Sequence, residues 1–505
     1  MNIGSYVALN ARRHPKKWAL TCEERVYTYE QFNQKVNHFA WGLLNLGVKK
    51  GEKVALFMTN SDYFAISYFA ILKIGAVAVP VNFRLVSREV HYILNQSETA
   101  VIICDVELKS VIEQAREGVR SVRRVITAGN GEGADFQMVM KEIDDEPNID
   151  VSSTDDAHII YTSGTTGHPK GAVFDHERVL KVAIGISGVL GLQVEDRLLH
   201  VAPLFHCAQL CLFLIPGFFL GTSHVIQREF HPVEVLKNID THKISLFFGV
   251  PTMYNYLFQV PNVENYNLSS IKRCCYGAAP MAPELVKKSM NVFQTKQFYN
   301  LCGLTEGGPT GIYLTPEDHQ KHLGKSGKTP LLFTEVNVVN IKGQEVVPGE
   351  VGELILRGET IMKEYYKKPK ETEDALQDGW LFTGDLATKD EEGYITLVDR
   401  KKDMIISGGE NVYSVEVEHV LYEHPNVLEA AVIGTPDPQW GEVVTAVVVV
   451  KEGESLIEEE VKQLCRNQLA GYKVPKKIVF ADQLPRNASG KIQKFKLRDT
   501  FNVQV

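Results

Sequence analysis

The sequence lacks several features that mark specialised classes of protein. Its eight cysteines include no C-x-x-C pair, and the chain contains no long basic run. Scattered cysteines in a chain of 505 residues indicate reduced, buried thiols and argue against a disulfide framework or a zinc site. A net charge of −8 argues against a nucleic-acid-binding protein.

The sequence also lacks a long hydrophobic run. The most lipophilic segment, residues 210–220, contains Pro216 and Gly217 and falls short of the roughly 20 apolar residues that span a bilayer. We therefore expect a buried helix or helix pair there, and no integral membrane segment. The first residues, MNIGSYVALNARRHPKK, lack the apolar core and cleavage site of a secretory signal. We expect a cytoplasmic protein and leave peripheral contact with a membrane open.

Short apolar strands alternate with amphipathic helices over about the first 300 residues. Thr28 and Gln31 have the spacing of a capping box before an apolar stripe, and Gly47 is expected to end that helix. The alternation predicts an α/β fold with two layers of mostly parallel sheet covered by helices. The predicted strands are residues 54–58, 76–81, 101–104 and 125–126 in the first layer, and 224–227, 246–250 and 274–276 in the second.

The pattern changes after about residue 324. Short strands separated by turn residues, at 336–339, 352–356 and 394–398, predict a small antiparallel sheet or β-barrel. Beyond a charged strip at 399–403, a compact α+β region is expected, with Ser414 as the N-cap of its first helix. Because the chain is too long for one core, we predict a large N-terminal domain, 1–399, and a small C-terminal domain, 400–505.

A stretch rich in glycine and hydroxyl groups, residues 161–171, follows a short apolar run and reads YTSGTTGHPKG. Small hydroxyl residues and glycines let several backbone N–H groups face one anion, and Lys170 adds a positive charge. The spacing is not that of a Walker loop, so a nucleoside triphosphatase of that class is not implied. A plain flexible linker is the alternative, but it does not require so dense a run.

Four further motifs accompany this stretch: YNLCGLTEGGP at 299–309, WLFTGDLA at 380–387, DRKKDMIISGGENVYSVEVE at 399–418 and PRNASGKIQK at 485–494. In this order and at these distances, the five motifs closely resemble the adenylate-forming superfamily of acyl-CoA synthetases, luciferases and peptide-synthetase adenylation domains. The resemblance covers essentially the whole chain. It implies that a carboxylate attacks the α-phosphate of ATP, and that the resulting acyl-adenylate passes its acyl group to a thiol. ATP, Mg²⁺ and coenzyme A are the implied cofactors and co-substrates.

The resemblance also implies roles for individual residues. Asp385 and Arg400 match the pair that hydrogen-bonds the ribose, although Asp385 alone reads as a turn residue. Lys491 matches the lysine that bridges the carboxylate and the α-phosphate, where catalysis is chiefly positioning and charge neutralisation. Thr165 and Glu306 match the positions that hold Mg²⁺. The positions that match the nucleotide-binding set are Thr162, Ser163, Gly164, Thr165, Thr166, Lys170, Cys302, Gly303 and Thr305.

In the family, the C-terminal domain is mobile and swings about a hinge between the two half-reactions. The hinge position matches Lys402, and Gly408 and Gly409 match the segment that lines the thiol tunnel. We expect Lys402 to affect thioester formation more than adenylation. Glycines at 408 and 409 would allow close approach of the backbone to the thiol substrate.

The resemblance places the acid near residues 203–206, where Phe205 and His206 match a pocket aromatic and a histidine beside the carboxylate. The segment FHCA offers no aspartate for an amino group, which disfavours an α-amino acid. The matched pocket walls are small or apolar, and they predict a hydrophobic acid: Tyr276, Gly277, Ala278, Ala279, Gly303 and Leu304.

Cys302 departs from the family pattern, which usually has an aromatic residue there to stack on adenine. Either adenine packs on Leu301 and Cys302, or Tyr299 or Tyr276 compensates. The leading interpretation is an acyl-CoA ligase for a medium- or long-chain fatty acid. The alternatives are an aryl- or cyclic-acid CoA ligase and an acyl-AMP ligase that loads a carrier protein. The oligomeric state is open, with a homodimer as one alternative.

Overall fold

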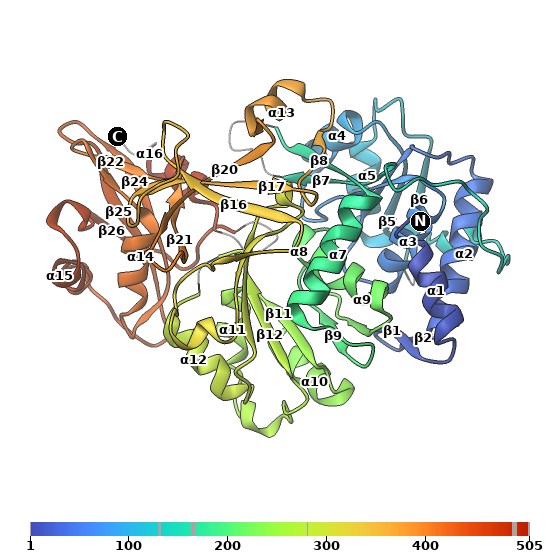
Figure 1. Cartoon of the computed structure of the whole chain (residues 1–505), viewed down its shortest axis with the longest axis horizontal. Coiled ribbons are helices and arrows are strands. Elements are labelled where there is room, and N and C mark those ends of the chain that lie inside the picture. The colour runs from blue at the N-terminus through green and yellow to red at the C-terminus, as the bar shows by residue number, and fades with distance from the viewer. Residues whose placement is uncertain (1, 130–132, 163–167, 280, 487–491, 503–505) are drawn as a thin grey trace.

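The computed structural model describes residues 2–129, 133–162, 168–279, 281–486 and 492–502. The N-terminal part contains two large sheets (Figure 1). The first has seven strands in the order β18-β8-β7-β4-β3-β5-β6. Its strands are β3 (Lys53–Phe57), β4 (Val77–Pro80), β5 (Thr99–Asp105), β6 (Arg124–Ala128), β7 (Asp156–Thr162), β8 (Lys170–Asp175) and β18 (Glu364–Tyr365). β3 to β7 run parallel, whereas β8 is antiparallel to β7 and to β18.

The second sheet has nine strands in the order β15-β14-β13-β12-β11-β9-β10-β1-β2. Its central strands are parallel, and the two ends turn antiparallel. The strands are β1 (Trp18–Cys22), β2 (Arg25–Thr28), β9 (Arg197–His200), β10 (Ser223–Ile226), β11 (Leu246–Gly249), β12 (Arg273–Gly277), β13 (Phe298–Gly303), β14 (Gly311–Leu314) and β15 (Thr329–Pro330). The expected pair of mostly parallel layers is confirmed.

Helices pack on both sheets and share one core between them. α3 (Asp62–Lys73) is buried at all 12 of its residues, as expected of a helix enclosed on every side. α2 (Tyr29–Asn45), α7 (His176–Leu190) and α9 (Ile215–Leu220) contribute to the same apolar cluster, in which Phe32 stacks on Phe218 with ring centroids 4.8 Å apart. The predicted capping box of α2 forms between Thr28 and Gln31, and the helix ends just before Gly47, which has a φ of +78°.

The lipophilic segment 210–220 is buried, as predicted. It forms a π-helical turn, Leu210–Leu214, that continues into α9. Within the ranges that the structure describes, no helix is both long and apolar enough to cross a bilayer.

A five-stranded antiparallel sheet follows, as the turn-rich sequence predicts. Its strands are β16 (Thr334–Val339), β17 (Val351–Gly358), β19 (Leu376–Gln377), β20 (Trp380–Lys389) and β21 (Ile395–Arg400). β17 lies between β16 and β20, and β20 also pairs with β19 and β21. This sheet lies between the two large sheets and the C-terminal part (Figure 1).

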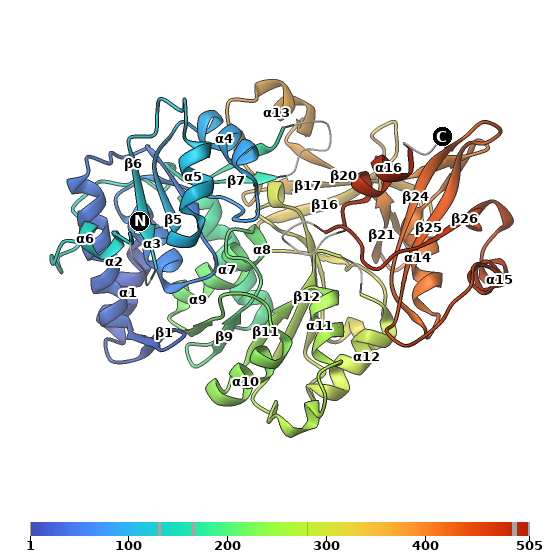
Figure 2. The same ribbon diagram turned by 180° about the vertical axis from the view of Figure 1, so that it is seen from behind.

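The C-terminal part has its own sheet and core. The strands are β22 (Ile405–Ser407), β23 (Glu410–Val412), β24 (Val427–Asp437), β25 (Gly441–Val450) and β26 (Lys477–Phe480), covered by α14 (Ser414–Tyr422), α15 (Glu458–Gln468) and α16 (Lys494–Asn502). Seen from behind, these elements again form a separate lobe (Figure 2). The prediction of Ser414 as an N-cap is wrong by one residue. Tyr413 occupies the cap position, and Ser414 is the first residue of the helix. The carboxylate of Asp399, which lies outside the helix, accepts the backbone N–H of Ser414.

Candidate active site

The carboxylate of Glu306 is the centre of a polar cluster where three segments of the chain meet. Glu306 lies in the short 3-10 turn Thr305–Gly307 that follows β13. Its Oε1 accepts a hydrogen bond from the Thr162 hydroxyl at 3.1 Å, and a second from the Tyr365 hydroxyl at 2.8 Å. The structure therefore brings together two residues that the sequence predicts for the site, Thr162 and Glu306, from positions 144 residues apart.

Lys170 completes this cluster from the other side of the glycine-rich loop. It pairs in register with Thr162 across the β7–β8 hairpin, so the two residues bracket residues 163–169. Its Nζ lies 4.3 Å from the centroid of the Tyr365 ring, close enough for a cation–π contact. Ser163, Gly164, Thr165 and Thr166, which the sequence predicts for phosphate and metal binding, lie outside the described residues.

Tyr365 is a site residue that the sequence analysis missed. It is 4% exposed and lies in β18, which pairs with β8 and so brings the ring beside Lys170. Burial, together with the neighbouring Glu306 carboxylate, raises the pKa of its hydroxyl above the ordinary value. The tyrosine therefore stays protonated, and its hydroxyl donates a hydrogen bond to Glu306. The segment EYYKK carries no pattern that distinguishes this position from an ordinary strand tyrosine.

Asp385 and Arg400 form the second predicted pair. They lie opposite each other on β20 and β21, and the Arg400 Nε is 2.9 Å from the Asp385 Oδ1. Gly384, with a φ of +72°, lies at an irregularity within β20, so Asp385 is a strand residue and not the turn residue that it resembles when taken alone. The two side chains are 13% and 33% exposed, respectively, which leaves them accessible to a ligand with hydroxyl groups.

His206 and Thr305 meet at the thiol of Cys207. His206 caps the short helix α8 (Cys207–Gln209), with its Nδ1 accepting the N–H of Ala208 at 3.2 Å. The Cys207 Sγ lies 3.1 Å from the Thr305 Oγ1 and 3.8 Å from the His206 Nδ1. Burial raises the pKa of this thiol to about 12, so Cys207 is protonated at neutral pH and is not a thiolate nucleophile. The contact joins the segment at 205–207 to the segment that holds Glu306.

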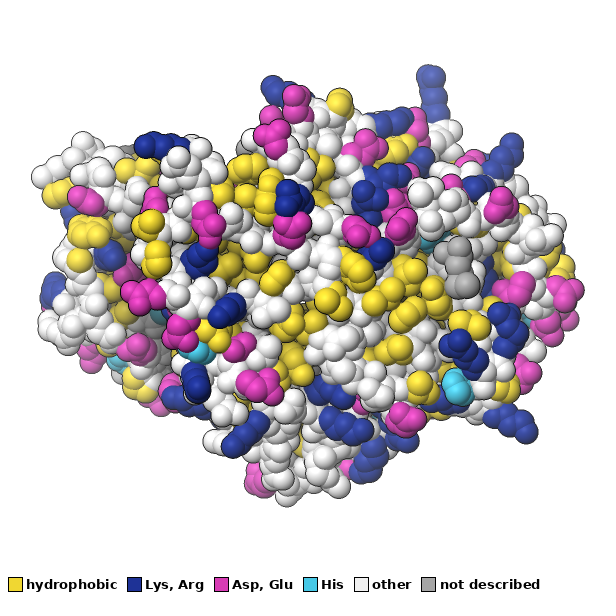
Figure 3. Space-filling view, in the orientation of Figure 1, with side chains coloured by type: hydrophobic (Ala, Val, Ile, Leu, Met, Phe, Trp, Pro, Cys, Tyr) yellow, Lys and Arg dark blue, Asp and Glu magenta, His cyan; other side chains and the backbone are white. Residues whose placement is uncertain are grey.

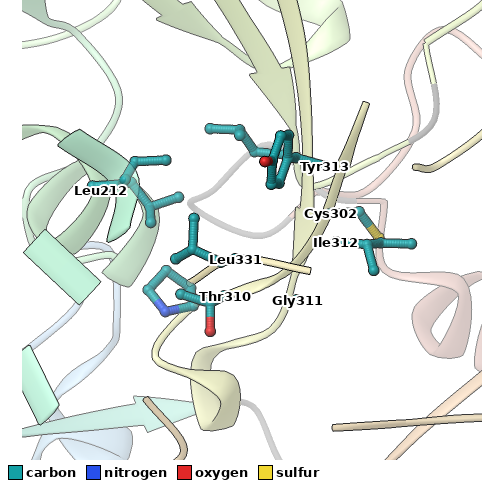
Figure 4. A pocket seen from close by; sticks show the side chains of 10 residues that line it. Leu212, Cys302, Thr310, Gly311, Ile312, Tyr313 and Leu331 are labelled. Atoms are coloured by element: carbon teal, nitrogen blue, oxygen red, sulfur yellow. The ribbon is translucent and has the colours of Figure 1, made fainter. Parts of the chain in front are cut away.

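Two neighbouring residues of β13 face opposite sides of the second sheet. Cys302 pairs with Ile312 of β14, and Leu301 pairs with Tyr313, so each pair shares one face. Figure 4 shows Cys302 and Ile312 on one side of β14, and Leu212 and Leu331 on the other. Cys302 packs towards the cluster of β16, β17 and β21. Leu301 and Cys302 both border a crevice.

That crevice lies between α7, the π-helical turn and β14, directly behind the segment that leads to Glu306. Its described lining residues are all uncharged: Ile186, Leu212, Leu301, Cys302, Pro309, Thr310, Gly311, Ile312, Tyr313 and Leu331. Leu331 packs closely on α7 because position 185 is glycine; a Cβ there would lie 3.2 Å from the leucine side chain. Outside it, Ile184, Leu332 and Phe333 are exposed, and apolar side chains gather over α7 on this face (Figure 3).

The other residues predicted for the acid pocket take separate positions. Phe205 is buried, with its ring edge-on to Phe83 at 5.6 Å between centroids. Tyr276 is buried in a different core, where its hydroxyl lies 3.0 Å from the His319 Nε2. Gly277 has no room for a side chain, since a Cβ would lie 2.3 Å from the Leu301 carbonyl oxygen. Ala278 and Ala279 are exposed, and Ala278 has a φ of +65°.

Comparisons with known proteins agree with this geometry. A family model described as AMP-binding enzyme matches residues 7–366, and a model described as AMP-binding enzyme C-terminal domain matches residues 416–491. The chain belongs to the AMP-binding enzyme family.

Individual relatives cover nearly the whole length of this AMP-binding enzyme. It is 37% identical to a feruloyl-CoA synthase from an Amycolatopsis species over 99% of both chains. It is also 37% identical to the long-chain-fatty-acid–CoA ligase FadD13 of Mycobacterium tuberculosis, over 95% of this chain and 94% of the relative. The solved structure of the anthranilate CoA ligase AuaEII with anthranoyl-AMP is similar with a TM-score of 0.92 at 30% identity, covering 100% of this chain and 98% of that one.

The expected resemblance to adenylate-forming acyl-CoA synthetases is thus confirmed. The protein is an AMP-forming acid–thiol ligase that works through an acyl-adenylate and takes a carboxylic acid, ATP and CoA as substrates. Mg²⁺ is the family's metal, and the residues present fit it. In the described part of the chain no three His, Cys, Asp or Glu side chains form a metal cluster. The single carboxylate of Glu306 suits Mg²⁺, because this ion commonly takes one or two protein carboxylates together with phosphate oxygens.

The first prediction concerns the hydrogen bond from Tyr365 to Glu306. Tyr365→Phe keeps the ring beside Lys170 and removes only the hydroxyl that orients the carboxylate. With Glu306 as the predicted Mg²⁺ ligand, we expect the Mg²⁺ concentration for half-maximal pyrophosphate release to rise by about tenfold, as for other groups that orient a metal ligand. Tyr366→Phe is the control, since its hydroxyl contacts Glu98 instead. An unchanged Mg²⁺ dependence for Tyr365→Phe would show that the bond does not orient Glu306.

Proposed function

We propose that this AMP-binding enzyme activates a hydrophobic carboxylic acid, of the medium- or long-chain fatty acid class, and transfers it to CoA. Two observations support the proposal: the uncharged described lining of the narrow crevice behind Leu301, and the similarity to a long-chain-fatty-acid–CoA ligase. The crevice has room for about one water, so an acyl chain that enters it must move its walls apart. A carboxylic acid with a charged or amino-bearing tail would have to leave that charge without a partner there, which is unfavourable. The fatty-acid–CoA ligase of M. tuberculosis, at 37% identity, agrees with this substrate class.

In this proposal the cluster around Glu306 holds the triphosphate. Lys170 and the loop that follows Thr162 contact the phosphates, and the Glu306 carboxylate with Thr165 would hold Mg²⁺. The metal, when bound, neutralises phosphate charge as the carboxylate approaches. Thr162 and Tyr365 keep the Glu306 carboxylate in place by donating hydrogen bonds to it.

The nucleoside and the transferred group are assigned to neighbouring residues. Asp385 accepts hydrogen bonds from the ribose hydroxyls, and Arg400 donates to them. Residues 302–305, at the end of β13 and the start of the 3-10 turn, contact the adenine. His206 lies beside the acid and the thiol path, where its ring contacts the segment of Thr305 through Cys207. Lys491 donates to the carboxylate and the α-phosphate, lowering the repulsion between two anions.

The proposal also includes two domains, residues 1–399 and 400–505, that move relative to each other about Lys402. Gly408 and Gly409 are supposed to face the thiol in the second half-reaction. Here the Gly408 N–H donates to the Trp440 carbonyl at 2.9 Å, and β22, which leads to this turn, lies at the far side of the C-terminal lobe from β7 and β8 (Figure 1). A rotation about the hinge would bring this turn to the site before thioester formation.

A second prediction tests the hinge. Lys402→Pro fixes the φ of the pivot residue, so we expect thioester formation from supplied acyl-adenylate to fall by about tenfold or more while adenylation falls much less. Lys401→Ala, at an exposed neighbouring lysine, is the control. Both half-reactions are measured in single turnovers. An equal loss in both would remove Lys402 from the role of pivot.

A panel of acids tests the proposed substrate class. ATP-dependent pyrophosphate release is measured with octanoate, palmitate, ferulate, a dicarboxylate and an α-amino acid, each with and without CoA. The proposal expects the highest kcat/KM for one of the two fatty acids and thioester only when CoA is present. Preference for ferulate would reassign the enzyme to aryl acids. Adenylate that accumulates without thioester would indicate a carrier protein as acceptor.

A cytoplasmic location belongs to the same proposal. ATP and CoA are supplied there, and all eight cysteines are free thiols, as expected in a reducing compartment.

A further inference from the structure

A chain of hydrogen bonds joins the two sides of the proposed hinge. Asp399 ends the N-terminal side, in β21, and is 6% exposed. Its Oδ1 accepts the Arg400 N–H at 2.7 Å, and its Oδ2 accepts both the N–H of Ser414 at 2.5 Å and the Ser414 hydroxyl at 2.8 Å. Ser414 lies beyond the hinge, so these two bonds from Ser414 cross the pivot.

The same serine contacts the helix that follows Lys491. Lys494 is the first residue of α16, and its Nζ donates to the Ser414 Oγ at 2.5 Å. That Nζ also lies 2.8 Å from the Glu418 Oε1, and the two side chains are 14% and 13% exposed. Ser414 therefore links Asp399 directly to the helix that begins three residues after the proposed catalytic lysine.

A second ion pair ties α16 to the other end of the hinge segment. The Arg498 Nη1 is 2.9 Å from the Asp403 Oδ1. Asp403 in turn donates its N–H to the Arg400 carbonyl at 2.8 Å. Residues 399 and 403, on either side of Lys402, are thus both held to α16, directly or through Ser414.

We propose that Asp399, Ser414 and Lys494 form a latch that holds the present domain arrangement for adenylation and opens for thioester formation. The three are positioning residues, and the inference rests on the hinge and half-reaction roles proposed above. In this arrangement the turn at Gly408 and Gly409 packs against Trp440 and not at the site. A rotation about Lys402 moves Ser414 relative to Asp399, and hydrogen bonds do not survive separations much beyond 3.5 Å.

The helix end at Ser414 shows what the latch supplies. Tyr413 in the N-cap position provides no side-chain hydrogen bond, so the first N–H of α14 depends on Asp399. A carboxylate at a helix N-terminus is also favoured by the helix dipole. By contrast, Glu418 bonds Lys494 and the Val432 N–H, 2.7 Å away, within the C-terminal part. Those contacts can persist during the swing, whereas the bonds from Ser414 to Asp399 must break.

The test separates the two half-reactions in single turnovers. Ser414→Ala removes the hydroxyl between Asp399 and Lys494, and Ser414→Thr retains it. We expect Ser414→Ala to slow pyrophosphate release by about tenfold, as for the loss of a hydrogen bond to a charged group. Thioester formation from supplied acyl-adenylate is expected to stay equal or become faster, and Ser414→Thr to restore adenylation. Thr445→Val is the matched control, because it removes a buried hydroxyl pair with Thr435 inside the C-terminal sheet.

Two outcomes overturn the latch: an equal loss of both half-reactions in Ser414→Ala, or a profile identical to that of Thr445→Val. If Ser414→Ala does not fold, Asp399→Asn is the second variant, because asparagine has nearly the size of aspartate but lacks its charge. The Lys402→Pro result distinguishes a failure of the latch from a failure of the hinge. If Lys402→Pro separates the half-reactions and neither Ser414→Ala nor Asp399→Asn does, the latch is wrong and the hinge stands. If Lys402→Pro lowers both equally, the hinge itself is wrong.

Discussion

Lys491→Ala is expected to slow formation of the acyl-adenylate by about 100-fold or more, because it removes a charge-stabilising donor from the transition state. Thioester formation from supplied acyl-adenylate is expected to continue at nearly the parental rate, since the lysine acts only where carboxylate and α-phosphate meet. The measurement is single-turnover pyrophosphate release beside single-turnover thioester formation.

The control for this prediction is Lys496→Ala, at an exposed lysine of α16, five residues further along the chain. It should leave both half-reactions unchanged. If Lys491→Ala lowers both half-reactions equally, the lysine contributes to folding or to general binding and not to adenylation. Comparable thermal unfolding midpoints for the two variants exclude a loss of fold as the cause.

Glu306→Gln is expected to lower adenylation by a similar factor, about 100-fold. The amide keeps the size of the side chain and can still accept the hydrogen bonds from Thr162 and Tyr365, but it lacks the charge that Mg²⁺ requires. High Mg²⁺ should therefore recover part of the activity. We expect no comparable loss when acyl-adenylate is supplied, because pyrophosphate has already left.

Glu373→Gln, at an exposed glutamate of α13 (Pro369–Ala375), is the matched control for loss of one carboxylate. A loss that no concentration of Mg²⁺ relieves would argue that Glu306 has a structural role. A loss of the same size in both half-reactions would argue likewise.

Much of the fold follows from local sequence signals. The capping box at Thr28, the glycine at 47 and the buried strands of the first sheet occur where periodicity and turn residues predict them. These features depend on contacts within a few residues, which a linear pattern records. The order of the strands does not follow from local signals, because β18 pairs with β8 although almost 200 residues of chain separate the two strands.

The site divides in the same way. Thr162 and Glu306 belong to sequence motifs, so their residue types and spacing predict their presence together. Tyr365 could not be predicted, since its role arises from the pairing of a two-residue strand with β8. Asp399 likewise caps a helix that begins 15 residues later, and a search for a local cap leads to Ser414 instead. Contacts between distant segments carry no local signature.

Cys302 illustrates how strand register places a side chain whose position residue type alone does not predict. Its pairing with Ile312 places Cys302 against the small antiparallel sheet, and both Cys302 and Leu301 border the crevice. Tyr276, considered in its place as an adenine contact, has its hydroxyl bonded to buried His319. A linear sequence cannot show which face of a sheet a residue occupies when the register with the neighbouring strands is unknown.

The central claim is that a carboxylate oxygen attacks the α-phosphate of ATP at the site around Glu306, and that a thiol then displaces AMP. The direct test is a reaction with ¹⁸O-labelled carboxylic acid, ATP, Mg²⁺ and CoA, followed by mass analysis of the nucleotide. The account predicts AMP carrying one ¹⁸O atom for each acyl-CoA formed, because the acyl C–O bond breaks when the thiol attacks. Unlabelled AMP, or ADP with labelled inorganic phosphate, would contradict it.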